Sequence, residues 1–292
     1  MLAVATVAAV VSSPWSGRSA IMAHPAWSSR QDSRQHNGTN VDYMFHGVTY
    51  QGYVSLPAAS GSRVLPGVLV AHQWMGLGDY EKSRADELAA MGYVAFALDV
   101  YGKGVRCTNV TCAQQTMKRV MDDMPSLLGL IAEGTSQLLK AGADADHLVA
   151  IGYCFGGSMV LELARHPHVG ASAGVAYRAV SSVHGVLAPL AKPASEGEIV
   201  HRVQVHHAEL DFQVRAVTTH TRPTHPALAL HMLTSQGDAA LVQLEKELKV
   251  GVNGSAGLWE TTKYAKCEHG WTEPDSPVYR ARAAVQAHKA AH

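Results

Sequence analysis

One segment places a nucleophilic thiol inside a tight turn: GYCFGG, residues 152–157, has Cys154 between glycines. An apolar run at 147–153 precedes it and a helical pattern at 157–164 follows. This is the strand–nucleophile–helix order of a nucleophile elbow, with cysteine where serine is usual. Small neighbours let strand and helix approach each other, and the helix N-terminus favours the reactive thiolate. The pattern predicts that Cys154 is a catalytic nucleophile rather than a buried structural cysteine.

A second segment, GASAG at residues 170–174, matches the serine form of the same motif by its letters. It follows an expected helix and leads into an expected strand, which reverses the order that the motif needs. We therefore expect residues 170–174 to form a surface loop.

The segments around the elbow alternate between short apolar runs and stretches of helical periodicity. This alternation predicts an α/β fold with a mostly parallel central sheet and helices on both faces. The expected strands are 50–56 (antiparallel), 67–71, 93–100, 147–153, 177–183, 202–206 and 258–264. The expected helices are 80–91, 117–139, 157–164, 240–249 and one that begins at about residue 278.

Four segments together resemble the dienelactone hydrolase family, and the resemblance extends from about residue 41 to the C-terminus. They are HQWMGL at 72–77, DVYG at 99–102, the elbow with its following residues 158–164, and EHGWTEP at 268–274. The resemblance implies an α/β-hydrolase fold, a Cys-His-Asp triad and the hydrolysis of lactones and esters.

In α/β-hydrolases the triad residues follow in the chain order nucleophile, acid, histidine. His269 follows the last expected strand and matches the family's histidine, so we predict that it takes the thiol proton and later activates water. The acid should end a strand between Cys154 and His269. Asp211 is favoured, because its distance downstream of His184 fits the family, and Asp238 is the alternative.

Residues 214–236 interrupt the expected passage from a strand end into a helix. Removing them joins Gln213 directly to Gly237 and restores an uninterrupted order of strand, Asp211 and helix. We therefore predict an insertion, and hypothesise a retained intron in the gene model, because valine and glutamine codons can hold intron ends. Transcript reads that span the segment without a gap would refute the intron hypothesis.

The oxyanion hole should consist of two backbone N–H groups, one after the nucleophile and one in the loop after an early strand. By position these belong to Phe155 and Trp74. Backbone donors tolerate a change of side chain, so this assignment depends on the fold.

Three residues are assigned to the substrate pocket: Gln73, Lys103 and Trp271. The resemblance implies that Gln73 replaces a glutamate near the nucleophile, and that Lys103 and Glu273 replace arginines that hold a substrate carboxylate. Lysine can bind a carboxylate only as a point charge, and glutamate repels it. We therefore expect an ester, lactone or thioester other than dienelactone.

The composition limits the partners that the chain can have. Its 292 residues are 47% hydrophobic and carry a formal net charge of zero, so no nucleic-acid groove or membrane patch is indicated. We expect a soluble protein with a small-molecule substrate, no cofactor, no metal, and a monomeric or small homo-oligomeric state. Histidines 201, 206, 207, 220, 225 and 231 lack the spacing of a zinc site.

Residues 1–40 are predicted to be a disordered leader that precedes a domain at 41–292. Residues 2–11 form an apolar run of signal-peptide length, but no basic residues precede it, so secretion and a cytoplasmic location both remain open. Cys107 and Cys112 could form one bridge or remain free thiols. A different class of function is also open: a binding or thiol-sensing protein that keeps the fold without turnover.

Overall fold

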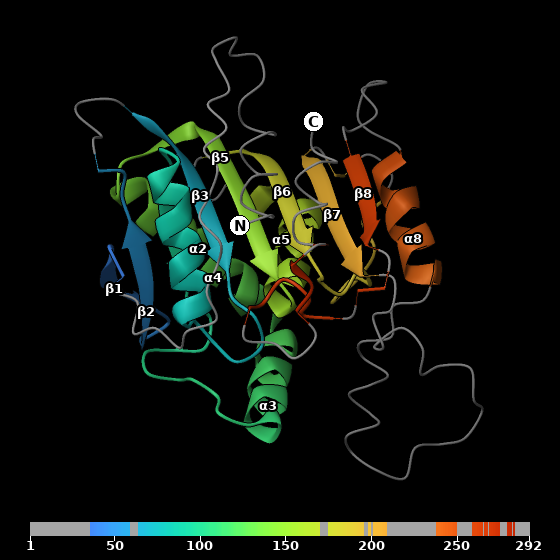
Figure 1. Ribbon diagram of the computed structural model, residues 1–292, viewed down its shortest axis with the longest axis horizontal. Helices are drawn as coiled ribbons and strands as arrows, with labels where there is room; N and C mark the ends of the chain where they lie inside the picture. Colours follow the sequence, from blue (N-terminus) through green and yellow to red (C-terminus); the bar gives the residue numbers. More distant parts are fainter. Residues whose placement is uncertain are drawn as a thin grey trace.

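The computed structural model describes residues 36–58, 64–169, 175–195, 198–199, 201–208, 238–249, 259–264, 266–267, 269–274, 279–281 and 283. Within these residues, one sheet has the strand order β1-β2-β4-β3-β5-β6-β7-β8 (Figure 1). The strands are β1 Thr39–Phe45, β2 Val48–Ser55, β3 Leu65–Ala71, β4 Val94–Leu98, β5 Ala143–Tyr153, β6 Tyr177–Val183, β7 Arg202–Ala208 and β8 Trp259–Tyr264.

Among the strands of this sheet, β2 alone runs opposite to the others. β1 pairs antiparallel with β2, and β2 pairs antiparallel with β4. All the pairs from β4 through β3, β5, β6 and β7 to β8 are parallel. In the centre of the sheet, β4, most of β3 and residues 148–153 of β5 are buried and mainly apolar, because both faces of the sheet are covered there. The predicted mostly parallel sheet is therefore confirmed.

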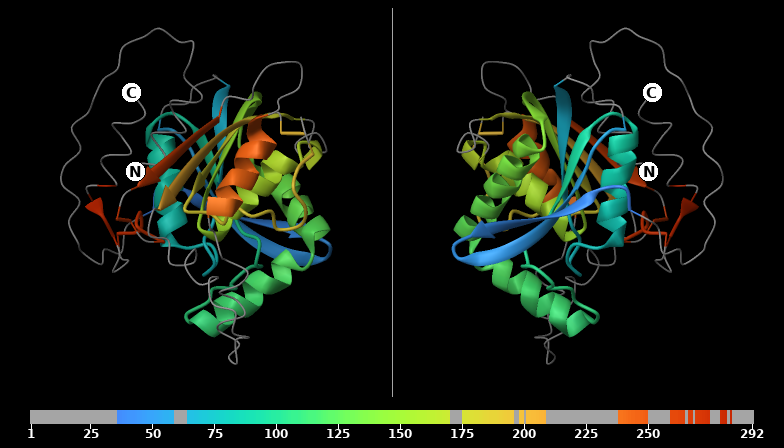
Figure 2. Two further views of the ribbon diagram at one scale, coloured as in Figure 1. Left: turned by 90° about the vertical axis from the view of Figure 1, so that its right-hand side faces the viewer. Right: turned by 90° about the vertical axis from the view of Figure 1, so that its left-hand side faces the viewer.

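Helices cover both faces of the sheet (Figure 2). They are α2 Asp79–Ala90, α3 Val110–Met121, α4 Met124–Lys140, α5 Phe155–Arg165 and α8 Asp238–Lys249. Alternate residues of β3 point to opposite faces: Val68 and Val70 pack in the cluster that holds Leu88 of α2, whereas Leu69 packs in the cluster that holds Leu127 of α4. The two hydrophobic clusters thus correspond to the two faces.

Within the described residues the predicted elements are present, but one of the predicted helices is wrong and several element ends differ by a few residues. The expected single helix at 117–139 is two helices, because the Asp123 side chain caps a new helix by accepting from the Ser126 N–H at 3.1 Å, and proline follows in its first turn. Proline is tolerated there and not in a helix interior. β1 was not among the expected strands, and it begins at Thr39, next to the expected start of the domain at residue 41; the division into leader and domain stays a prediction.

Several predictions fall on residues outside the described ranges. They concern the leader before residue 36, the loop at 170–174, the insertion at 214–236, and most of the helix expected from about residue 278. None of the described helices is long and apolar enough to cross a membrane. Of the two possibilities for Cys107 and Cys112, one bridge or two free thiols, the structure has the bridge: they form a disulfide.

A buried ion-pair cluster fastens α8 to α5. Arg165, at the end of α5, donates to Glu247 of α8 at 2.8 Å and to Glu162 at 2.9 Å, and these side chains are at most 1% exposed. Its remaining guanidinium nitrogen donates to the Leu187 carbonyl at 2.8 Å. The cluster pairs each of the two buried carboxylates with the Arg165 guanidinium and fixes how α8 lies against α5.

Candidate active site

The carboxyl ends of the parallel strands meet at one edge of the sheet, where the arrowheads point in Figure 1. Ligands of open α/β sheets bind at this edge. The loop after β3, Cys154 after β5, His184 after β6 and the residues around His269 after β8 all lie at strand ends on this edge.

Cys154 occupies the turn between β5 and α5 with φ of 54° and ψ of −118°, a conformation that L-residues rarely adopt. Two glycines make this turn possible. A Cβ on Gly152 would lie 1.9 Å from the Gly156 carbonyl oxygen, and one on Gly156 would lie 2.2 Å from the Ala71 carbonyl oxygen. The strand–turn–helix order expected from the sequence is present, and it projects the Cys154 side chain at the edge of the sheet.

His269 lies against the nucleophile: its Nε2 is 3.0 Å from Cys154 Sγ. Both side chains are partly exposed, so a substrate can reach them. A thiol and an imidazole at this distance can exchange a proton, which is the first requirement of nucleophilic catalysis by cysteine. The structure thus brings together two of the residues that the sequence singled out.

His184 is a member of this cluster that the sequence did not indicate. It follows β6 with φ of 41°, is fully buried, and its Nδ1 lies 3.1 Å from the backbone N of Cys154. The same N–H also donates to the Val183 carbonyl at 3.0 Å. Its Nε2 lies 2.8 Å from the Thr272 hydroxyl oxygen.

These contacts fix the tautomer of His184. Because Nδ1 accepts from a backbone N–H, the ring proton is on Nε2 and is donated to Thr272. Burial, with a smaller effect of the neighbouring His269, holds the pKa of His184 well below its usual value. The imidazole is therefore neutral, and it joins the elbow to the segment that carries His269, whose ring centroid is 5.1 Å away.

The loop after β3, residues 72–77, is called the oxyanion loop below. The Gln73 carbonyl accepts from His72 Nδ1 at 2.6 Å and from the Gly76 N–H at 3.2 Å. In a trans peptide the N–H points opposite to the carbonyl, so these bonds also fix the direction of the Trp74 N–H. Phe155 is the first residue of α5, where backbone N–H groups have no partner within the helix. Both predicted donors are therefore on rigid supports.

Glu81 of α2 holds the other side of the oxyanion loop. Its carboxylate is 1% exposed and accepts from the Gln73 N–H at 3.2 Å and the Gly78 N–H at 2.9 Å. With its amide nitrogen turned toward Glu273, the Gln73 side chain donates to that carboxylate at 2.8 and 3.2 Å. Gln73 thus joins α2 and the oxyanion loop to the segment that carries His269.

The other two predicted pocket residues have different surroundings. Lys103 forms an ion pair with Asp42 of β1, and it lines a cavity of about 490 Å³ beside the β1–β2 hairpin, α3 and α4. The lining residues of that cavity include neither Cys154 nor His269. Trp271 is 1% exposed and packs against Tyr264, with ring centroids 4.3 Å apart and the ring planes tilted by 35°.

The structure does not place the residue that is favoured as the triad acid. Asp211 falls in the range 209–237, which the structure does not describe, and Asp238 is the first residue of α8. The choice between Asp211 and Asp238 therefore stays a prediction. No cluster that could hold a metal ion is found among the described residues.

Comparison with known proteins agrees with this fold. A model of the dienelactone hydrolase family matches residues 50–228, more than half of the chain. A protein provisionally named carboxymethylenebutenolidase from Aquifex aeolicus (strain VF5) is 31% identical over 132 residues, 44% of this chain and 55% of that protein. Protein usf of Aquifex pyrophilus is 29% identical over the same shares. The chain spans about half the length of the curated relatives it matches.

Solved structures resemble the chain over most of its length. The structure m3DLH is 25% identical, with a TM-score of 0.65, and the match covers 87% of this chain and 94% of that one. A dienelactone hydrolase-like promiscuous phosphotriesterase from metagenomic libraries is 24% identical, with a TM-score of 0.66 over the same shares, which bears on the fold alone.

The fold and the elbow are those of an α/β-hydrolase. The family match then makes the assignment specific: the chain belongs to the dienelactone hydrolase family.

Proposed function

We propose that the chain hydrolyses a small ester or lactone through an acyl-cysteine intermediate on Cys154. One observation carries the proposal: His269 Nε2 lies 3.0 Å from Cys154 Sγ at the tip of an elbow. Family membership supports the same reaction class.

The reaction begins with proton transfer from the Cys154 thiol to His269 Nε2, and the thiolate attacks the carbonyl carbon. The carbonyl oxygen gains negative charge and accepts from the N–H groups of Phe155 and Trp74. Collapse of this intermediate breaks the bond to the leaving oxygen, which takes the proton from His269. Water, deprotonated by His269, then attacks the acyl-cysteine, and the released thiolate recovers the proton.

The triad acid in this proposal is Asp211. A carboxylate beside the second ring nitrogen of His269 would orient the imidazole and stabilise its protonated form. Asp238 is the alternative, and the pair of variants Asp211→Asn and Asp238→Asn distinguishes them. The variant that lowers kcat by orders of magnitude identifies the acid, while the other keeps most of the activity.

The pocket is proposed to favour neutral substrates. The contact between Gln73 and Glu273 places a carboxylate next to the oxyanion loop, and a negatively charged substrate group would be repelled there. We keep Lys103 and Trp271 as proposed pocket residues. p-Nitrophenyl acetate should therefore react faster than p-nitrophenyl hemisuccinate. The variant Lys103→Ala tests whether Lys103 belongs to the pocket. A KM increase confined to the anionic hemisuccinate ester would support that role of Lys103.

The central experiment is hydrolysis of p-nitrophenyl acetate by the parent, Cys154→Ala and Cys154→Ser. We expect an initial burst of nitrophenol from the parent, no turnover by the alanine variant, and greatly reduced turnover by the serine variant. Equal rates for all three would refute the proposal. A parent that is alkylated rapidly at Cys154 but releases no product would instead be a binding or thiol-sensing protein.

A further inference from the structure

The oxyanion loop is held from outside by residues 101–107, called the clamp segment below. The Tyr101 hydroxyl donates to the Trp74 carbonyl at 2.9 Å, and the Cys107 N–H donates to the Met75 carbonyl at 2.9 Å. Burial raises the pKa of Tyr101, so its hydroxyl remains protonated and available as a donor. Adjacent carbonyls of the oxyanion loop are therefore bound by the two ends of the clamp segment.

The middle of the clamp segment also lies against the loop. Arg106 donates to the Leu77 carbonyl at 3.1 Å, and a Cβ added to Gly78 would lie 2.0 Å from the Arg106 guanidinium. A Cβ on Gly76 would lie 2.9 Å from the Val105 carbonyl oxygen. The two segments pack without room for an intervening side chain, so a movement of one displaces the other.

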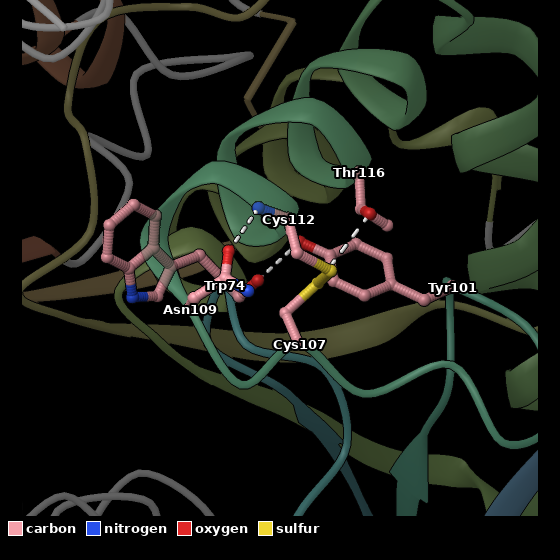
Figure 3. The surroundings of a disulfide bond; sticks show 6 residues. All are labelled: Trp74, Tyr101, Cys107, Asn109, Cys112 and Thr116. Atoms are coloured by element: carbon pink, nitrogen blue, oxygen red, sulfur yellow. Dashed lines mark hydrogen bonds between the residues drawn. A yellow bond between two sulfur atoms is a disulfide. The ribbon is translucent and has the colours of Figure 1, made fainter.

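The start of the clamp segment is fixed to the sheet, since the Lys103 N–H donates to the Thr49 carbonyl at 2.9 Å and the Lys103 side chain pairs with Asp42. Its later part is mostly exposed. Residues 103–109 include the rest of the clamp segment and the two residues before α3. Among them Cys107 alone is buried, at 5% exposure. Its sulfur is bonded to Cys112 in the first turn of α3, a turn that Asn109 caps by accepting from the Cys112 N–H at 2.9 Å (Figure 3). The Thr116 hydroxyl lies 3.7 Å from the Cys107 sulfur. The disulfide thus fastens the clamp segment to a helix.

We propose that the Cys107–Cys112 disulfide is a positioning element of the active site, which holds the clamp segment and so keeps the Trp74 N–H directed at the reacting carbonyl oxygen. The inference rests on the proposed function of the same site. Reduction by a dithiol, which itself becomes a disulfide, converts the bond into two thiols and detaches Cys107 from α3. The exposed clamp then moves more freely, and the oxyanion loop moves with it.

Two reactions of Cys154 distinguish a disulfide that positions the Trp74 N–H from a disulfide that only stabilises the fold. Acylation by an ester develops an oxyanion and needs the Trp74 N–H, whereas alkylation by iodoacetamide displaces iodide and develops none. Removing one oxyanion donor typically costs about 100- to 1,000-fold in kcat, so a loosened donor should cost at least about tenfold. Reduction should lower the ester burst rate and kcat, with a smaller change in KM, and leave the alkylation rate unchanged.

The experiment compares the parent before and after treatment with dithiothreitol, the reagent then being removed, with the double variant Cys107→Ala, Cys112→Ala. In the reduced parent and in the double variant, Cys154 should be acylated at least about tenfold more slowly than in the oxidised parent. The rate at which iodoacetamide alkylates Cys154 should be the same in all three forms. The treatment should have no effect on the double variant, which controls for action of the reagent elsewhere. If the double variant does not fold, the reduced parent provides the same comparison.

Two outcomes would overturn the inference. Unchanged ester hydrolysis in the reduced parent means that the disulfide does not position the loop. An equal fall of acylation and alkylation means that it supports the elbow or the fold in general. In both cases the loss of turnover in Cys154→Ala still tests the proposed function separately, so the two failures can be told apart.

Discussion

His206 makes the stability of this protein depend on pH in a way that can be calculated. The side chain lies on β7, is 4% exposed, and its Nδ1 is 2.8 Å from the Tyr264 hydroxyl. Its Nε2 has no hydrogen-bond partner within the described part of the chain. Burial lowers the pKa of His206 from 6.5 to about 4, and the neighbouring strand places the neutral His184 beside it.

Because the folded protein binds a proton at His206 less readily than the unfolded chain, the free energy of unfolding falls as the pH falls. Between pH 6.5 and about 4 the unfolded chain binds a proton at His206 and the folded chain does not, so acidification favours unfolding. Each unit of pKa difference corresponds to about 1.4 kcal/mol, which gives a total of about 3 kcal/mol for this residue. The stabilisation is fully present above pH 6.5, and about 2 kcal/mol of it is lost between pH 7.5 and 5.

The test is His206→Gln, which keeps a hydrogen-bonding group for Tyr264 and removes the titration. Urea unfolding at pH 7.5 and at pH 5 gives the free energy of unfolding of the parent and the variant. The parent should lose about 2 kcal/mol more than the variant between these pH values. The exposed residue His168 provides the matched control, His168→Gln. Equal losses in the parent and His206→Gln would refute the calculation.

Three further substitutions have expected outcomes. Gly152→Ala places a Cβ 1.9 Å from the Gly156 carbonyl oxygen, so it should cost about 3 kcal/mol or more in urea unfolding and abolish ester hydrolysis. Arg165→Ala leaves two buried carboxylates unpaired and should cost about 3–5 kcal/mol in the same assay, while Arg165→Lys should recover part of the loss. His184→Ala removes one of the two acceptors of the Cys154 N–H and leaves the Val183 carbonyl. We expect kcat/KM to fall about 10- to 100-fold and iodoacetamide alkylation of Cys154 to slow as well. Normal alkylation would contradict a role of His184 in positioning the elbow.

The elements that the sequence predicts well are those whose signals are local. Buried central strands are apolar runs with glycine or a polar residue at their ends, and the elbow combines such a strand with closely spaced glycines. The break at Asp123 was also local, because a capping residue followed by proline begins a helix, but the apolar periodicity on both sides concealed it.

Contacts between distant segments could not be predicted in this way. Lys103 reaches Asp42 because β1 and the loop after β4 come together in the fold, although they are far apart in the chain. Trp271 is buried because it packs in one cluster with Ala208 of β7 and Tyr264 of β8. His184 is one of 17 histidines, and only the pairing of β5 with β6 places it beside Cys154. Spacing alone could not decide between a bridge and two thiols at Cys107.

The ion pair between Arg165 and Glu247 bears on whether the protein tolerates insertions before α8. Because α8 is held by Glu247 and by buried leucines at 241, 244 and 248, its attachment does not depend on the length of chain that joins it to β7. The entropy of closing a flexible connection rises slowly, by about 0.6 kcal/mol for each doubling of its length. Residues added to the chain before α8 should therefore leave the contacts of Glu247 and these leucines unchanged. Selection on the attachment of α8 then acts on Arg165, Glu247 and the three leucines rather than on the number of residues that precede the helix.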